Sequence, residues 1–226
     1  MIQTFKAELI EKSNLTSDVL FLSFKVPKNF TFKAGQFVTM ILKLDQVQKP
    51  RSYSILSPPS KIGFLDFCVK IIDNGFASEI FRELEIGDDI TIKGPLGHFI
   101  FDEKTENEHW FIGVGTGVTP LYSMIKEYSD SGKILKLLFG EKTQKDLLFH
   151  DEFLQLKVNH PNFEYIPTLS RGTWNGKTGR VQKYLLGDLQ NKTFYICGLK
   201  ELVIETKELL LNKGVNPLDI KFERYT

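Results

Sequence analysis

The chain has 226 residues, of which 42% are hydrophobic and 25% are charged, a balance typical of a folded protein with one large or two modest domains. Its formal net charge of +1 provides no overall attraction for nucleic acid. Two cysteines, Cys68 and Cys197, are too few for an iron–sulfur cluster, which needs about four thiolates, and the four histidines show no metal-ligand spacing.

The first half of the chain is rich in short runs of β type. Glycine and proline separate these runs at the spacing expected of a small antiparallel barrel. The runs are residues 19–26, 35–42, 63–72 and 88–94. One helix is expected at 76–84, where Phe76, Ile80 and Leu84 recur at helical spacing. The N-terminus has no signal-peptide core and no later run is long enough to span a membrane, so we expect a cytoplasmic protein.

The stretch RSYS, residues 51–54, is polar on both faces of a strand. Arg51 and Tyr53 share one face at a period of two, and Ser52 and Ser54 share the other. An edge strand with a stray charge is one interpretation, and a ligand-binding strip is another.

The second half changes to alternating strands and helices, which predicts a parallel α/β sheet. The expected strands are residues 110–114, 134–140, 163–169 and 193–198. The expected helices are residues 119–129, 145–157, 179–187 and 200–214.

A glycine-rich turn follows the first strand of this half. Gly113, Gly115 and Gly117 lead into a helix with Pro120 in its first turn. Glycines let a backbone approach a ligand closely, and the N–H groups at a helix start attract phosphate. The spacing is not G-x-G-x-x-G, so a plain tight turn stays possible, but a bound dinucleotide is favoured.

Further polar groups follow later strands. Cys197 and Gly198 end a strand, at the edge where open α/β sheets bind ligands, although a buried structural cysteine is the common alternative. Ser170, Arg171 and Arg180 lie in a loop after another strand, where arginines either bind phosphate or are ordinary surface charge.

Nine short motifs, taken in order, resemble the ferredoxin–NADP reductase superfamily over essentially the whole chain. They are RSYS, GFAS, GPLGHF, GVGTGVTP, FGEKTQKDLLF, SR, GR, CG and the ending FERYT. The resemblance implies two domains: an antiparallel Greek-key β-barrel that binds FAD in residues 1–102, and a parallel-sheet α/β domain that binds NAD(P) in residues 108–226.

The resemblance also implies roles for individual residues in flavin binding. Arg51 would bind the flavin pyrophosphate, Tyr53 would lie against the flavin, and Ser54 would lie near its reactive N5. Gly75, Ala77 and Ser78 correspond to a phosphate-binding turn at a helix start. The implied FAD site is Arg51, Ser52, Tyr53, Ser54, Val69, Lys70, Gly75, Phe76, Ala77, Ser78 and Tyr225.

For the nicotinamide nucleotide, the resemblance implies that Ser54, Cys197 and Glu223 form the catalytic group, with Tyr225 an aromatic residue that nicotinamide must displace. The implied NAD(P) site is Gly115, Thr116, Gly117, Pro120, Lys142, Ser170, Arg171, Arg180, Cys197 and Gly198. The positions of Lys142, Ser170, Arg171 and Arg180 match those that hold a 2′-phosphate, which favours NADPH. Glu141 follows the second strand and can favour a ribose hydroxyl instead, so NADH stays possible.

The function implied is that of a monomeric FAD enzyme that exchanges hydride with NADPH and single electrons with a separate ferredoxin or flavodoxin. The alternatives are an NADH-dependent reductase component of an oxygenase, a free-flavin reductase and an electron-transfer subunit of a larger complex. Such subunits of dihydroorotate dehydrogenases carry a C-terminal cysteine cluster that this sequence lacks. A non-catalytic nucleotide-binding module would require that no flavin is bound.

Overall fold

The computed structural model describes residues 1–225, which form two compact units. The first unit contains Met1–Phe101 together with Tyr122–Glu127. The second contains Asp102–Leu121 and the described residues from Tyr128 onward. Within residues 1–225, no helix combines the length and the apolar character needed to cross a bilayer.

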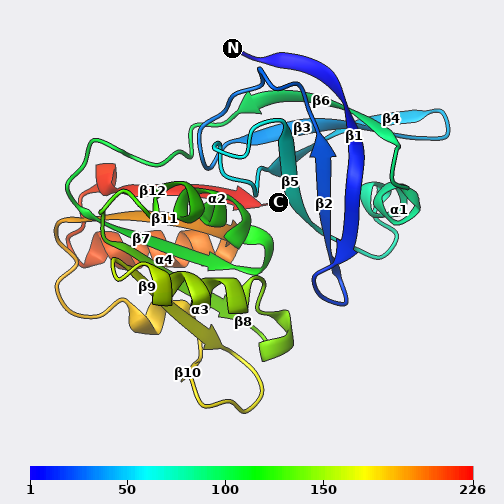
Figure 1. The fold of residues 1–226 in the computed structure, drawn as a ribbon. Helices are drawn as coiled ribbons and strands as arrows, with labels where there is room; N and C mark the ends of the chain where they lie inside the picture. Colours follow the sequence, from blue (N-terminus) through cyan, green and yellow to red (C-terminus); the bar gives the residue numbers. More distant parts are fainter. Residues whose placement is uncertain (226) are drawn as a thin grey trace. The chain divides into compact units, whose positions relative to one another are not determined.

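The first unit is built on a six-stranded antiparallel sheet with the strand order β4-β3-β6-β1-β2-β5 (Figure 1). Its strands are β1 Gln3–Asn14, β2 Val19–Lys25, β3 Phe37–Leu44, β4 Val47–Ser54, β5 Phe64–Lys70 and β6 Asp89–Leu96. Alternation decides which face is buried: Ala7 and Leu9 are fully buried, whereas Lys6 and Glu8, which alternate with them, are exposed. The predicted antiparallel β domain is confirmed.

Aromatic side chains fill the core of the first unit and hold its helix in place. Phe24 and Phe67 meet edge to face with ring centroids 5.9 Å apart. The helix α1, Phe76–Glu83, lies within the predicted range and buries Phe81 against Tyr53 of β4 at 5.3 Å. This contact holds α1 beside the end of β4.

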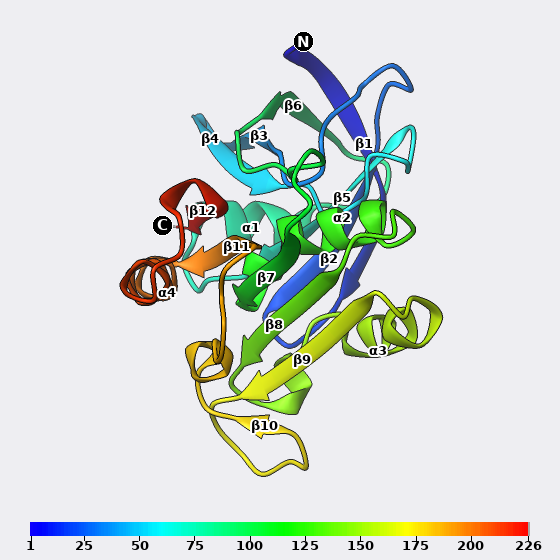
Figure 2. The same cartoon turned by 90° about the vertical axis from the view of Figure 1, so that its left-hand side faces the viewer.

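The second unit contains a parallel sheet with the strand order β10-β9-β8-β7-β11-β12. Its strands are β7 Glu108–Val114, β8 Leu135–Glu141, β9 Phe163–Leu169, β10 Lys177–Thr178, β11 Lys192–Leu199 and β12 Ile220–Tyr225. Figure 2 shows β11, β7, β8 and β9 side by side and pointing the same way. The predicted α/β domain is confirmed, and the carboxyl ends of its strands share one edge.

Helices cover both faces of this parallel sheet. They are α3 His150–Asn159 and α4 Lys200–Asn212. The helix α2 Val118–Tyr128 begins in the second unit, and its residues Tyr122–Glu127 belong to the first. On one face, Phe153 of α3 packs against Tyr165 of β9 with ring centroids 5.1 Å apart. The next residue of β9, Ile166, packs into a cluster that contains Leu202 and Val203 of α4. Because adjacent strand residues point to opposite faces, α3 and α4 lie on opposite sides of the sheet.

Two of the predicted helices are wrong in extent. The helix predicted at 145–157 begins only at His150, because Phe149 has the left-handed φ of 56° and residues Gln144–Asp146 form a separate 3-10 turn. The helix predicted at 179–187 is reduced to the 3-10 turn Val181–Tyr184. Arg180 before the turn is extended, and Leu185 after it has a φ of −84° and a ψ of 68°, so the helical conformation ends after four residues.

Candidate functional site

In the first unit, two cations lie against one aromatic ring at the start of α1. The Nζ atom of Lys49 is 4.8 Å from the ring centroid of Phe76, and the guanidinium carbon of Arg51 is 6.0 Å from it. Arg51 also donates from Nη1 to the carbonyl oxygen of Pro50 at 2.9 Å. Among residues 1–225, no carboxylate forms an ion pair with either cation. Positive charge therefore remains available here for an anionic ligand.

The helix N-terminus adds to this positive potential. Phe76 is the first residue of α1, and no side chain caps the helix. The first N–H groups of any helix have no partner within the helix, and the helix dipole is positive at that end. The Oγ atom of buried Ser78 instead accepts a hydrogen bond from the N–H group of Ile72 at 2.9 Å. Ser78 thus stabilises the preceding turn, while the backbone and the two cations suit a phosphate.

Exposure falls steadily along the end of β4. Arg51 and Ser52 are exposed, Tyr53 is half-buried and Ser54 is only 6% exposed. Burial raises the pKa of Tyr53 to about 12, and the charge of Arg51 opposes this shift. The phenol is therefore neutral at physiological pH. The predicted strip runs from a charged end, through a flat ring, to a buried hydroxyl.

Two residues predicted for FAD binding have side chains engaged elsewhere in the first unit. Val69 is 2% exposed and belongs to the hydrophobic core. Lys70 forms an ion pair with Asp18 across the β2–β5 pair. Val69 could therefore contribute to ligand binding only through its backbone, whereas the ion pair of Lys70 lies on the surface, where a ligand could compete with Asp18.

In the second unit, the glycine-rich turn lies directly against the end of β11. The turn Gly115–Gly117 is a 3-10 turn that leads into α2. A Cβ atom on Gly117 would lie 2.4 Å from the carbonyl oxygen of Cys197 and 2.7 Å from the Cα atom of Gly198. Only glycine permits this approach. The structure therefore brings Gly117, Cys197 and Gly198 together, as their assignment to one nucleotide site requires.

The neighbouring pair of strands places two more predicted residues beside Cys197. The β11–β12 register pairs Cys197 with Glu223 and Leu199 with Tyr225. Complete burial raises the pKa of the Cys197 thiol well above its usual range, the charge of Glu223 raises it further, and a hydrogen bond with Tyr225 opposes both. The thiol stays protonated at neutral pH. Cys197 is thus a small polar contact and not a thiolate nucleophile.

The residues predicted for a 2′-phosphate meet at the carboxyl ends of β8 and β9. The N–H group of Arg171 donates to the carbonyl oxygen of Lys142 at 2.8 Å, and that of Ser170 donates to Glu141 at 2.8 Å. The side chains of Lys142, Ser170 and Arg171 are exposed. Arg180 follows the short strand β10, which pairs with the end of β9.

A carboxylate lies next to the glycine turn. The Oε1 atom of Glu141 lies 3.9 Å from the position that a Cβ atom on Gly115 would occupy. A carboxylate here suits a ribose hydroxyl, whereas the cations after β8 and β9 suit a phosphate. Both kinds of recognition group are present at this edge of the sheet.

Two residues that lie at these sites, Lys49 and Glu205, were not predicted from the sequence. Lys49 lies two residues before Arg51 on the same face of β4, and the period of two offered a signal for it. Glu205 of α4 forms an ion pair with Arg180, from which it is 25 residues distant along the chain. No local pattern pointed to that contact.

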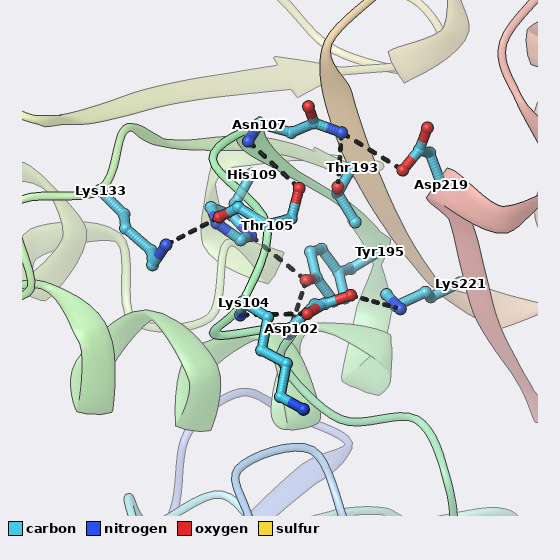
Figure 3. Close-up of polar contacts among 10 residues, drawn as sticks. All are labelled: Asp102, Lys104, Thr105, Asn107, His109, Lys133, Thr193, Tyr195, Asp219 and Lys221. Carbon is cyan, nitrogen blue, oxygen red and sulfur yellow. Dashed lines mark hydrogen bonds and ion pairs between the residues drawn. The ribbon is translucent and has the colours of Figure 1, made fainter.

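A separate polar cluster in the second unit lies near the amino ends of the parallel strands β7 and β11 (Figure 3). The hydroxyl oxygen of Tyr195 accepts from the N–H group of Asp102 at 2.9 Å and lies 3.2 Å from Nδ1 of His109. The carboxylate of Asp102 pairs with Lys221 at 3.2 Å. The cluster fastens the segment that precedes β7 to the second unit.

Comparisons of sequence match both units to known families. Residues 6–101 match the oxidoreductase FAD-binding domain, and residues 111–208 match the oxidoreductase NAD-binding domain. The chain is 34% identical over 244 residues to ferredoxin–NADP reductase B of Sorangium cellulosum, with 100% of both chains covered. It is also 26% identical to the phenol hydroxylase P5 protein of Acinetobacter pittii. That alignment covers all of this chain and 66% of the P5 protein.

Solved structures share the fold. A ferredoxin–NADP reductase from Neisseria gonorrhoeae, with bound FAD and NADP, superposes with a TM-score of 0.87 at 20% identity over 98% of both chains. The cytochrome P450 reductase GcoB of Amycolatopsis gives a TM-score of 0.92 at 22% identity and covers all of this chain and 70% of that one.

Proposed function

Because the chain belongs to the ferredoxin–NADP reductase family of FAD- and NAD(P)-binding oxidoreductases, we propose that it moves hydride between NADPH and FAD and exchanges single electrons with a separate ferredoxin or flavodoxin. One observation carries the choice of nucleotide: Lys142 and Arg171 meet at the carboxyl edge of the parallel sheet. Both are exposed, and neither forms an ion pair with a carboxylate in residues 1–225.

The residues of the first unit fit FAD. Lys49, Arg51 and the N-terminus of α1 offer positive charge and free N–H donors at one place, as a pyrophosphate requires. Tyr53 supplies a flat surface held by Phe81, and Ser54 supplies a hydroxyl in a dry environment. Bound FAD would supply the capacity to take up two electrons together and to release them singly.

In the second unit we assign positioning and binding roles. Gly117 lets the glycine-rich turn lie directly against the backbone of β11, and the neutral thiol of Cys197 contacts the nicotinamide without reacting with it. Glu223 provides a carboxylate beside Cys197. Tyr225 holds a hydrogen bond with Cys197, which the incoming nicotinamide would replace. These groups orient the cofactor, which carries the chemistry.

A second function has one specific observation in its favour. Glu141 lies beside the glycine turn, where a carboxylate favours the unphosphorylated ribose of NADH. The similarity to the phenol hydroxylase P5 protein is compatible with an NADH-dependent reductase that serves an oxygenase. The two functions differ in which nucleotide reduces the flavin.

An anaerobic titration of the purified protein tests the proposal. We expect a flavin absorbance spectrum that NADPH bleaches at much lower concentration than NADH, and that added ferredoxin or flavodoxin restores. NADH is the matched control, because it lacks only the 2′-phosphate. Preference for NADH would move the assignment to an oxygenase-type reductase. A colourless protein that takes up no FAD would contradict the proposal as a whole.

A further inference from the structure

One of the cations assigned to NADPH already has an anionic partner. The Nη1 atom of Arg180 donates to Oε2 of Glu205 on α4 at 2.6 Å. The Nε2 atom of Gln182 donates to the same oxygen at 3.4 Å. Both charged side chains reach solvent, Arg180 with 70% of its surface and Glu205 with 47%. The ion pair is thus on the surface and open to competition from a ligand.

The backbone places Arg180 with the other residues assigned to the 2′-phosphate. The N–H group of Gly179 donates to the carbonyl oxygen of Leu169, the last residue of β9, at 2.7 Å. Val181 packs so closely on β8 that a Cβ atom on Gly140 would lie 2.8 Å from its Cγ1 atom. Arg180 therefore lies beside the ends of β8 and β9, the strands that Lys142 and Arg171 follow.

We propose that Glu205 is a specificity-determining residue that competes with the 2′-phosphate of the nucleotide for Arg180. The inference rests on the proposed use of NADPH. A phosphate that pairs with Arg180 must first displace the carboxylate of Glu205, whereas a nucleotide without the 2′-phosphate has no need of Arg180. Glu205 thus lowers the affinity for NADPH and leaves that for NADH unchanged, so it narrows the preference between them.

Calorimetric titration with two nucleotide fragments tests this role without any turnover. The probes are adenosine 2′,5′-bisphosphate and adenosine 5′-monophosphate, which differ only in the 2′-phosphate. In Glu205→Gln we expect the bisphosphate to bind about three- to fivefold more tightly at low salt, the range that an exposed ion pair can contribute. The monophosphate should bind as it does to the wild type.

Glu208→Gln is the matched control. Glu208 is exposed, lies on the same helix and loses the same charge, but it has no contact with Arg180. We expect this variant to bind both probes as the wild type does. When Glu205→Gln is added to Arg180→Ala, the affinity for the bisphosphate should not change further, because there is then no arginine for which the carboxylate and the phosphate compete.

The possible failures are distinguishable. A wild-type protein that binds both probes equally would overturn the use of NADPH and this inference with it. A wild-type protein that prefers the bisphosphate, combined with a Glu205→Gln variant that binds it no more tightly, would overturn only the role of Glu205. If Glu205→Gln binds both probes more tightly by the same factor, or if Glu208→Gln binds the bisphosphate equally more tightly, the change in affinity comes from net charge alone. Either result would also overturn that role.

Discussion

A single buried histidine makes the stability of the second unit depend on pH. His109 is fully buried beside Tyr195, whose hydroxyl accepts from Asp102 and can donate its own proton to Nδ1 of the ring (Figure 3). Burial, reinforced by the charge of Lys133, lowers the pKa of His109 to about 4, although Asp102 opposes this shift. The native protein therefore holds a neutral imidazole at pH 5, whereas an unfolded chain binds a proton there.

The sign of the effect follows from proton counting. Between about pH 6.5 and pH 4 the unfolded state binds one more proton than the native state, so the free energy of unfolding falls as the pH falls. At about 1.4 kcal/mol per unit, lowering the pH from 6.5 to 5 should cost about 2 kcal/mol. In His109→Asn, the free energy of unfolding should fall by about 2 kcal/mol less over the same pH range.

Urea unfolding at pH 7 and pH 5, followed by tryptophan fluorescence, measures this difference. Both tryptophans, Trp110 and Trp174, belong to the second unit, so the signal reports the unit that contains His109. His109→Asn also serves as the control for every other titrating group. The same loss between the two pH values in both proteins would show that His109 is not responsible.

At the scale of elements, the register between β8 and β9 brings together the two distant segments of the proposed 2′-phosphate site. The N–H group of Arg171 bonds to Lys142 because the two strands run in parallel and end together. Arg171→Ala should raise the KM for NADPH about tenfold or more, the value of a hydrogen bond to a charged group, with little change for NADH. Steady-state kinetics with both nucleotides checks this.

Lys157→Ala provides the comparison for that variant. Lys157 is an exposed cation on α3 and is not among the residues that bind nucleotide. It should change neither KM. Equal increases for NADPH and NADH in Arg171→Ala would mean that Arg171 does not read the 2′-phosphate.

The same elements show how far the sequence predicts the structure. Most strands of both sheets, such as β2 and β8, and the helix α1 were predictable because alternation or apolar runs follow from burial. The strand β12 was not predicted, because an edge strand with exposed Phe222 and Arg224 lacks such a pattern. The segment around Val181–Tyr184 is helical in composition, but the non-helical backbone angles of Arg180 and Leu185 limit it to a short turn.

The residues of the candidate site also differ in whether the sequence predicts them. Arg51, Gly117 and Arg171 occupy recognisable positions after strands or before helices, so their motifs were readable. The ion pair of Arg180 with Glu205 depends on how α4 packs, which no local pattern encodes. Sequence motifs therefore predicted the candidate binding residues, whereas the proposed competition by Glu205 depends on a tertiary contact.

At the scale of the whole molecule, the two cofactor sites assigned here belong to different units. The cations at Phe76 lie in the first unit, and those after β8 and β9 lie in the second. A ligand that binds only the native state stabilises it by about 2.7 kcal/mol at one hundred times its Kd. FAD and NADP+ should therefore each raise the Tm of the apoprotein through separate residues.

Two variants, each the control for the other, test this separation. Arg51→Ala should diminish the rise in Tm caused by FAD and keep the rise caused by NADP+, and Arg171→Ala should do the reverse. Scanning calorimetry of the apoproteins measures both shifts, and tryptophan fluorescence isolates the transition of the second unit, which contains Trp110 and Trp174. If either substitution diminishes both shifts equally, the assignment of the two cofactors to separate sites is wrong.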